Sequence, residues 1–423
     1  MLNQESRVFY GWRIAGAACG LQFLYAALFL QAFGAYVAVL SEELGWSKTA
    51  LAGGAAVLSL EGALLGPLLG WLLDRFGPRV MVQTGVVVFA CGFALLGGIE
   101  TLPGFYAAMT VVALGVTFCS YFPLSVAIVR FFRRQRARAL SVMSLGLAAG
   151  GLALPALGWA MALLGWRYTA WASGVLILLI GFPLACVIRG DPAEVGATVD
   201  GRDEPAPAEG EPVSTGEFSL TQALRTHAFW LISIGHGLAL LVVTAVNVHA
   251  ISHMKEGLGY SLQEATGFIT LLTLCQGTGI VLGAVLGDRW QKHHVAAGCM
   301  LAHMLGLLML TFAIHPLMLV AFAVMHGMAW GLRGPFMQAL RADYFGVRSI
   351  GMILGVSAAF VAIGQVAGPL VAGALADLTG NYRAGFVLLA LLAGSGTVMF
   401  LMAKKPALPS APQAPDRVSP GRE

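Results

Sequence analysis

Charged residues are scarce in this chain. Asp, Glu, Lys and Arg make up 11% of its 423 residues, whereas a soluble globular domain carries about 25%. Hydrophobic residues account for 58%, and the mean hydropathy is +0.79. This composition excludes an ordinary soluble domain and indicates a protein that lies mostly in lipid.

Long polar interruptions are also few. We count twelve apolar stretches that each reach the roughly 20 residues a spanning helix needs, beginning near Arg13, Thr49, Val80, Gly104, Ala139, Thr169, Phe229, Leu262, Val295, Leu317, Ile350 and Ala384. Only helices and closed barrels satisfy the backbone in lipid, and unbroken apolar runs exclude the alternating strands of a barrel. We predict an all-α membrane protein of twelve transmembrane helices in two pseudo-symmetric six-helix bundles.

Residue patterns for metal binding or catalysis are missing. The cysteines stand singly in apolar segments, without metal-ligand or redox spacing: Cys19, Cys91, Cys119, Cys186, Cys275 and Cys299. We also find no nucleophile, metal cluster or phosphate-binding loop, and no cleavable signal peptide. We therefore expect neither an enzyme nor a bound metal or cofactor.

The basic residues predict the orientation. With the N-terminus in the cytoplasm, all but five of the 25 lysines and arginines fall on the cytoplasmic side, as the positive-inside rule requires. Four lie on the outer side of the membrane: Lys48, Lys255, Arg167 and Arg383. The fifth, Arg333, lies within a span. An even number of spans puts both termini in the cytoplasm of a cell membrane protein. The net charge of +4 reflects this topology and does not indicate nucleic-acid binding.

Two segments have a different composition. Residues 190–226 and 406–423 are rich in Pro, Ala, Gly and charged residues, and cannot bury enough apolar surface to fold. We assign residues 1–189 to an N-terminal bundle, 190–226 to a cytoplasmic linker, 227–405 to a C-terminal bundle and 406–423 to a disordered tail.

The two halves repeat a motif. Gly62, Gly66 and Gly70 precede Asp74-Arg75, and Gly279 and Gly283 precede Asp288-Arg289. A second correspondence joins residues 165–167 (Gly-Trp-Arg) to residues 381–383 (Asn-Tyr-Arg). Small residues four apart let helices approach closely. Such internal repeats are typical of transporters whose substrate site lies between the halves near the midplane.

The segment Gly70-Trp71-Leu72-Leu73-Asp74-Arg75-Phe76-Gly77-Pro78-Arg79 resembles the G-x-x-x-D-R-x-G-x-R loop of the major facilitator superfamily. The resemblance implies that Asp74, Arg75 and Arg79 help to close the cytoplasmic face, with Asp288 and Arg289 as a degraded second copy. The alternative is that these charges only anchor the topology.

Two further patterns resemble the monocarboxylate transporter and oxalate/formate antiporter group. They are Phe9-Tyr10-Gly11-Trp12 and Phe131-Phe132-Arg133-Arg134-Gln135-Arg136. The chain departs from that group in lacking a basic residue in helix 8 or helix 11. It also lacks the Gly-Pro motif that drug antiporters carry in helix 5, which disfavours that class.

Arg333 is the candidate for substrate binding. An arginine within a bilayer is costly and usually functional, and a guanidinium grips a carboxylate with two parallel hydrogen bonds. In the superfamily that the chain resembles, helices 1, 4, 7 and 10 line a central cavity. We expect these helices to bring the following residues around an organic anion: Arg333, His326, Trp330, Tyr121, Gln22, Tyr25, Phe29, His236 and Asn247. The alternative is that Arg333 caps carbonyls or pairs with a structural acid.

Glu61 is the one acidic residue expected deep in a span. A desolvated carboxyl there should have a raised pKa and could carry a proton. It could instead form an interhelical hydrogen bond to Gln365 or Ser357.

Three functions remain open from the sequence. The leading one is a monomeric, proton-coupled carrier of a small monocarboxylate, working by rocking of the halves. The second is an exporter of amphipathic compounds or drugs. The third, a sensor without transport activity, finds no signalling domain to support it.

Overall fold

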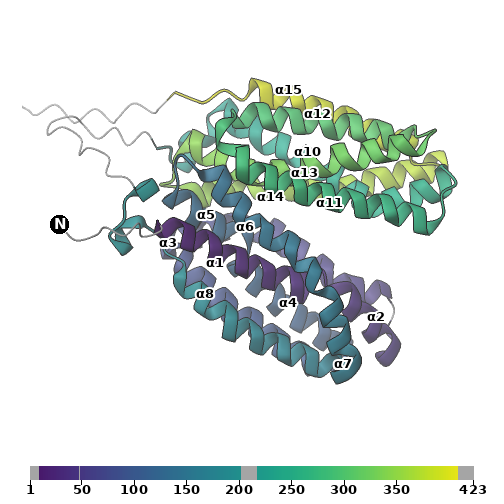
Figure 1. Cartoon of the computed structure of the whole chain (residues 1–423), viewed down its shortest axis with the longest axis horizontal. Helices are drawn as coiled ribbons and strands as arrows, with labels where there is room; N and C mark the ends of the chain where they lie inside the picture. The colour runs from purple at the N-terminus through teal and green to yellow at the C-terminus, as the bar shows by residue number, and fades with distance from the viewer. Residues whose placement is uncertain (1–8, 47, 202–216, 408–423) are drawn as a thin grey trace, which may run out of the picture.

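The computed structural model describes residues 9–46, 48–201 and 217–407, and within these ranges all regular structure is helical. The side chains of some helical residues, among them Glu61, lie outside the description. Two bundles of helices meet at the end that carries the start of α1 and the described ends of the linker, called here the linker end. They diverge toward the opposite, far end (Figure 1).

The N-terminal bundle contains α1 to α8. Its main helices are α1 (Tyr10–Tyr25), α2 (Phe33–Leu44), α3 (Lys48–Gly97), α4 (Leu102–Cys119), α5 (Tyr121–Phe131), α6 (Arg136–Gly150), α7 (Leu154–Leu176) and α8 (Phe182–Val187). A π-helical turn at Ala26–Leu30 joins α1 to α2, and another at Ile177–Gly181 joins α7 to α8.

The C-terminal bundle contains α10 to α15, and a short α9 (Leu220–Leu224) precedes it. Its helices are α10 (His227–Ser252), α11 (Leu262–Leu286), α12 (Lys292–Thr311), α13 (Pro316–Phe345), α14 (Ile350–Thr379) and α15 (Arg383–Met402). A third π-helical turn, His253–Gly257, extends α10.

Ten helices in the described residues are long and apolar enough to span a membrane. Two continuous helical segments contain a residue that is not helical. Gly77 in α3 (φ 77°, ψ 162°) and Gly165 in α7 (φ 77°, ψ 161°) adopt a positive φ that glycine tolerates and other residues rarely do. Each lies where the sequence predicts one span to end and another to begin.

The halves contact each other mainly through α3 against α14 and α6 against α11. Glycine makes the first contact possible. A Cβ atom on Gly66 would lie 2.8 Å from the Gly355 carbonyl oxygen, and one on Gly70 would lie 2.5 Å from that of Gly351. The predicted role of these glycines in close helix packing therefore fits α3, and the facing partner is α14.

The linker is folded at both ends, so the expectation that its whole length is unfolded is wrong there. The carboxylate of Asp200 accepts hydrogen bonds from the backbone N–H groups of Arg133 and Arg134. On the other half, Glu217 accepts one from the N–H of Val347. Phe218 and Ala223 are also buried, and the ring of Phe218 packs against that of Phe345. Average composition does not predict these few anchoring residues.

Candidate functional site

Arg333 lies in α13 and is 1% exposed. Its Nε and Nη1 atoms have no hydrogen-bond partner, and it forms no ion pair with a carboxylate in the part of the chain that the structure describes. The carbonyl caps and structural acid of the alternative interpretation are therefore not found there. A buried cation without a partner is unfavourable, so this guanidinium is suited to receive an anion.

The helix opposite Arg333 is broken in the middle. α4 ends at Cys119 and α5 begins at Tyr121, because Ser120 leaves the helical conformation (φ −99°, ψ −149°). The Ser120 hydroxyl accepts the Tyr121 N–H and donates to Oε1 of Gln22 at 3.4 Å. An internal helix N-terminus of this kind favours negative charge, and the sequence did not predict it.

Tyr121 and Gln22 contribute further unpaired polar atoms. The Tyr121 hydroxyl is buried close to Ser144 but forms no hydrogen bond, and it lies within electrostatic range of Arg333 and Arg341. Nε2 of Gln22 is also buried and unpartnered. The structure therefore brings Gln22, Tyr121 and Arg333 together, one from each of α1, α5 and α13.

Beyond Tyr25, the residues of helix α1 no longer point to the face on which Gln22, Tyr25 and Phe29 were predicted to lie together. Tyr25 is half-buried, but Phe29 is buried and packs on Phe33 and on Phe89 of α3. The π-helical turn that starts at Ala26 adds a residue to the turn, so the regular α-helical spacing used to group Gln22, Tyr25 and Phe29 no longer holds. Phe29 belongs to the packing of the N-terminal bundle.

His326 faces a neighbouring helix of its own bundle. It is fully buried, and its Nδ1 lies 3.1 Å from Nδ1 of His303 in α12. The predicted stripe of α13 residues is regular, but α13 packs on α12 as well as α11, and spacing alone does not reveal which neighbour each residue meets. Trp330, on the same helix, is half-buried.

A buried polar cluster joins α10, α13 and α14. Arg341 donates from Nη2 to the Ser357 hydroxyl at 2.7 Å and lies 3.1 Å from Nδ1 of His236. Ser233 donates to Ser357 at 2.9 Å. Arg341 is 2% exposed, because α13 continues to Phe345 and packs its last turns within the protein. The sequence did not predict this burial.

Asn247 lies eleven residues after His236 on α10, which is roughly 16 Å toward the far end on a similar face. It is exposed. The structure therefore does not bring Asn247 together with Arg333 through any described contact. Glu61 lies within α3, and its side chain is outside the described residues.

The acidic residues of the repeated motif cross between the halves. The Asp74 carboxylate accepts the N–H groups of Gly351 and Met352 at the start of α14, at 3.0 and 2.8 Å. Asp288 accepts those of Ala137 and Arg138 at the start of α6, both at 2.9 Å. Each half thus caps the start of a helix in the other half. Although the second copy of the motif is degraded in sequence, its Asp288 makes the same kind of contact as Asp74.

Charges around these two contacts are paired. Arg130 lies 3.5 Å from Asp74, and Asp343 pairs with Arg136 at 2.6 Å and with Lys292 at 2.8 Å. Burial raises the pKa of the Asp288 carboxyl, an effect opposed by its two N–H donors and Lys292. The pairing of Asp343 was not predicted, because no motif marks it.

The basic residues of the motif behave differently from the acidic ones. Arg75 is exposed and lies over the rings of Trp71 and Phe76. Arg79 and Arg289 are exposed and make no described contact across the interface. In this conformation, the contacts between the halves use the carboxylates of the motif and not its arginines.

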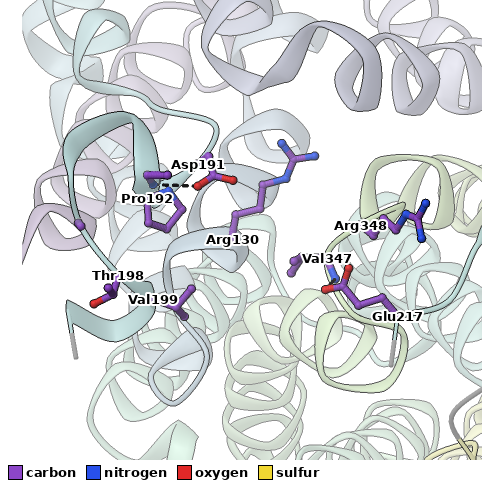
Figure 2. Close-up of a pocket in the computed structure, with 10 residues that line it drawn as sticks. Arg130, Asp191, Pro192, Thr198, Val199, Glu217, Val347 and Arg348 are labelled. Carbon is purple, nitrogen blue, oxygen red and sulfur yellow. Dashed lines mark hydrogen bonds between the residues drawn. The ribbon is translucent and has the colours of Figure 1, made fainter. Parts of the chain in front are cut away.

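A surface pocket of 580 Å³ lies at the linker end. Arg130 and the linker residues Asp191 to Val199 form one side, and Glu217, Val347 and Arg348 form the other (Figure 2). None of the predicted substrate-binding residues lines this pocket. It marks where the two halves and both ends of the linker come together.

An all-helical membrane protein with two bundles and unpaired polar groups between them has the architecture of a secondary transporter. The profile of the Major Facilitator Superfamily matches residues 18–249 and 232–422. The chain therefore belongs to the major facilitator superfamily and is a multi-pass membrane protein. The family predicted from the sequence motifs is confirmed.

Curated relatives agree with the predicted subgroup. Monocarboxylate transporter 13 of Bos taurus is 26% identical over 335 residues, which cover 78% of this chain and 75% of the relative. The oxalate:formate antiporter of Oxalobacter formigenes is 26% identical over 212 residues, 48% of this chain and 44% of the relative. The fujikurins efflux protein of Gibberella fujikuroi is 22% identical over 337 residues, 78% and 67% of the two chains.

Solved structures share the fold. The human organic anion transporter MFSD10 superposes with a TM-score of 0.67 at 16% sequence identity, covering 92% of this chain and 99% of the other. At this level of identity, the similarity concerns the fold alone.

Proposed function

We propose that this protein is a secondary active transporter that carries a small organic anion, of the monocarboxylate class, across the membrane by alternating access. The observation that carries this proposal is the buried guanidinium of Arg333, which has two unpartnered nitrogens beside two unpartnered groups of the other half. An unsatisfied buried polar group in a native structure calls for an explanation, and a carboxylate ligand supplies one.

The site offers complementary donors for a carboxylate. Arg333 binds the two oxygens, and the N-terminal end of α5 adds a favourable dipole. The Tyr121 hydroxyl and the Gln22 amide orient the anion from the N-terminal half. Tyr25 and Trp330 pack against its apolar part. His236 and Asn247 lie on the path toward the linker end and the far end, respectively.

We further propose twelve spans with both termini in the cytoplasm of a cell membrane protein that acts as a monomer. Division of α3 at Gly77 and of α7 at Gly165 supports this count, since it converts ten helical segments into twelve. The arginines at residues 130–138 cluster at the linker end, which supports a cytoplasmic position for that end.

Alternating access requires contacts that form in one state and break in another. Asp74 and Asp288 fit this role, because each joins the halves only while the linker end is closed. Arg75, Arg79 and Arg289 would then find partners in the opposite state. Proton coupling completes the proposal, with Glu61 as the candidate carrier from the sequence.

Uptake into proteoliposomes tests the substrate site. Labelled lactate and oxalate are supplied with and without an inward proton gradient to wild type, Arg333→Gln and the matched control Arg383→Gln, an exposed arginine at the start of α15. Loss of a buried charged partner typically costs about 2–5 kcal/mol, so Arg333→Gln should reduce uptake by roughly 30-fold or more. Normal uptake by Arg333→Gln, or no carboxylate uptake by wild type, would refute the proposal.

Export of amphipathic compounds is the second candidate, and the fungal efflux relative favours it. An apolar compound needs no guanidinium partner, so export of a neutral dye should survive Arg333→Gln. Measuring both activities in the same proteoliposomes separates the two functions.

A further inference from the structure

Two histidines meet inside the C-terminal bundle. His303 of α12 and His326 of α13 are both fully buried, with their Nδ1 atoms 3.1 Å apart and their ring centroids 4.4 Å apart. The Nε2 atom of each ring is buried and has no partner among the described residues. Among the described residues, the ring of Phe322 also contacts the pair, 5.6 Å from His326.

The hydrogen bond between the Nδ1 atoms restricts the protonation states. One ring must carry its proton on Nδ1 and donate it, and the other must accept, with its own proton on Nε2. The donor ring therefore has a bare Nε2 with a free lone pair in an apolar site. Addition of one proton to this nitrogen turns the contact into a charge-assisted hydrogen bond, which is stronger than the neutral one.

No third ligand joins the two rings. The described part of the chain contains no cluster of three or more His, Cys, Asp or Glu side chains that could hold a metal ion. Two imidazoles alone are a poor metal site, but they can share one added proton. A second added proton would place two positive charges side by side, so the pair binds only one added proton.

Arg333 is the charged group that faces this pair. It lies seven residues, or two turns, after His326 on the same side of α13, and it interacts electrostatically with both histidines. The thiol of Cys299 is the other titratable group near Arg333 from α12. α15 also packs on α12, where Gly394 and Gly396 lie against Met304 and Met300. α11 packs on α13, and its Cys275 lies against Gly327, the residue after His326. Burial is the main obstacle to charging either ring, and the positive charge of a free Arg333 adds a smaller one. An anion bound to Arg333 removes this second contribution.

We propose that His303 and His326 form a proton-binding site that takes up one proton when an anion neutralises Arg333. Anion and proton then favour each other's binding, as reciprocal linkage requires. The proton binds to the free Nε2, travels with the anion, and leaves when the anion leaves. This inference rests on the proposed anion site and names the coupling site of the same transporter.

Spectroscopy tests the proton site without depending on transport. The full-length protein, labelled with ¹⁵N-histidine and held in lipid bilayers, is titrated across about pH 5–8, the range in which histidine acts as a switch. The ¹⁵N resonances that disappear or shift in His326→Gln are assigned to His326 and His303. The Arg333→Gln variant should take up the proton at a pH higher by about one unit or more, as removal of a nearby like charge predicts. Sodium lactate added to wild type should act in the same direction. A pair that stays neutral in Arg333→Gln throughout this range would overturn the proposal.

Transport provides the second test. In His326→Gln and His303→Gln, exchange of labelled for unlabelled lactate should persist, whereas accumulation driven by an inward proton gradient should fall to the level seen without a gradient. His249→Gln, which removes an imidazole bonded to the Pro369 carbonyl, is the matched control and should accumulate lactate normally.

Glu61→Gln is measured in parallel. Accumulation lost in Glu61→Gln and retained in both histidine variants would overturn the proposal. If wild type moves no carboxylate, the proposed function fails, while the titration still decides whether the pair binds a proton.

Discussion

The charged groups at the linker end are paired, whereas polar groups in the middle of the molecule are not. At the linker end, Asp74, Asp288 and Asp343 each have two or more partners, and most of these partners belong to the other half. In the middle, Arg333 and Tyr121 have buried polar atoms that form no hydrogen bond with any described residue. Satisfied groups stabilise one conformation, and unsatisfied groups need a ligand. The difference separates the part that holds the halves together from the part that we propose to bind substrate.

The largest effect is expected from removing both acidic caps. Asp74→Asn and Asp288→Asn each lose a charge that receives two backbone hydrogen bonds, and hydrogen bonds to charged groups contribute about 1.5–3 kcal/mol. Each variant should shift the equilibrium away from the closed linker end by roughly 10-fold, and the double variant by roughly 100-fold, because distant sites add.

Distances between spin labels measure this shift. Labels at Arg134 and Arg348, on exposed positions of the two halves, report opening of the linker end in a background without the native cysteines. The single variants are the controls for additivity. An unchanged distance distribution in the double variant would show that the caps do not hold the halves together.

A steric change at the same interface should act more weakly. In Gly70→Ala the new methyl group would lie 2.5 Å from the Gly351 carbonyl oxygen, so α3 and α14 must separate. Overpacking costs about 1–3 kcal/mol, which corresponds to opening of the linker end by roughly 10-fold. The same labels measure it. Gly158→Ala, where no atom lies within 4 Å of the new methyl, should leave the distance unchanged.

These interface contacts could largely be predicted from the sequence. The repeated Gly and Asp-Arg motifs marked Asp74 and Asp288 as equivalent, and the apolar runs predicted where the spans begin. The motif did not reveal that only the carboxylates cross between the halves in this state. The arginines share the motif, but contact depends on the conformation that the structure represents.

The candidate site was harder to predict, because it depends on departures from regular helix. The break at Ser120 and the π-helical turn after Tyr25 change which side chains face the middle. Pro123, in the first turn of α5, was a signal for the break, because proline cannot donate to the carbonyl four residues earlier. The turn at Ala26–Leu30 contains neither Pro nor Gly. The burial of Arg341 was missed, because no motif marks its partners His236 and Ser357 on α10 and α14. Arg333 was found because a charge inside an apolar run is visible without knowing the fold.

A conservative change at Arg333 tests whether the proposed anion site needs the planar geometry of a guanidinium. Arg333→Lys keeps the positive charge but removes the planar pair of donors. We expect lactate affinity to fall by roughly 10-fold, the cost of about one hydrogen bond to a charged group. Binding is measured by calorimetry in detergent. Equal affinity of Arg333→Lys and wild type would show that the site needs only charge.

The smallest effect should come from Tyr121→Phe, which deletes a hydroxyl that forms no hydrogen bond with the described residues. If that hydroxyl binds substrate, lactate affinity should fall by about 5-fold, the cost of one neutral hydrogen bond, with no loss of thermal stability. Tyr106→Phe is the opposite case, because the Tyr106 hydroxyl donates to the Ala50 carbonyl at 2.6 Å. It should lower the melting temperature by about 2–4 °C and leave affinity unchanged. If Tyr121→Phe behaved like Tyr106→Phe, the Tyr121 hydroxyl would be structural. Arg333 and Gln22 would then remain as the candidate groups for binding the anion.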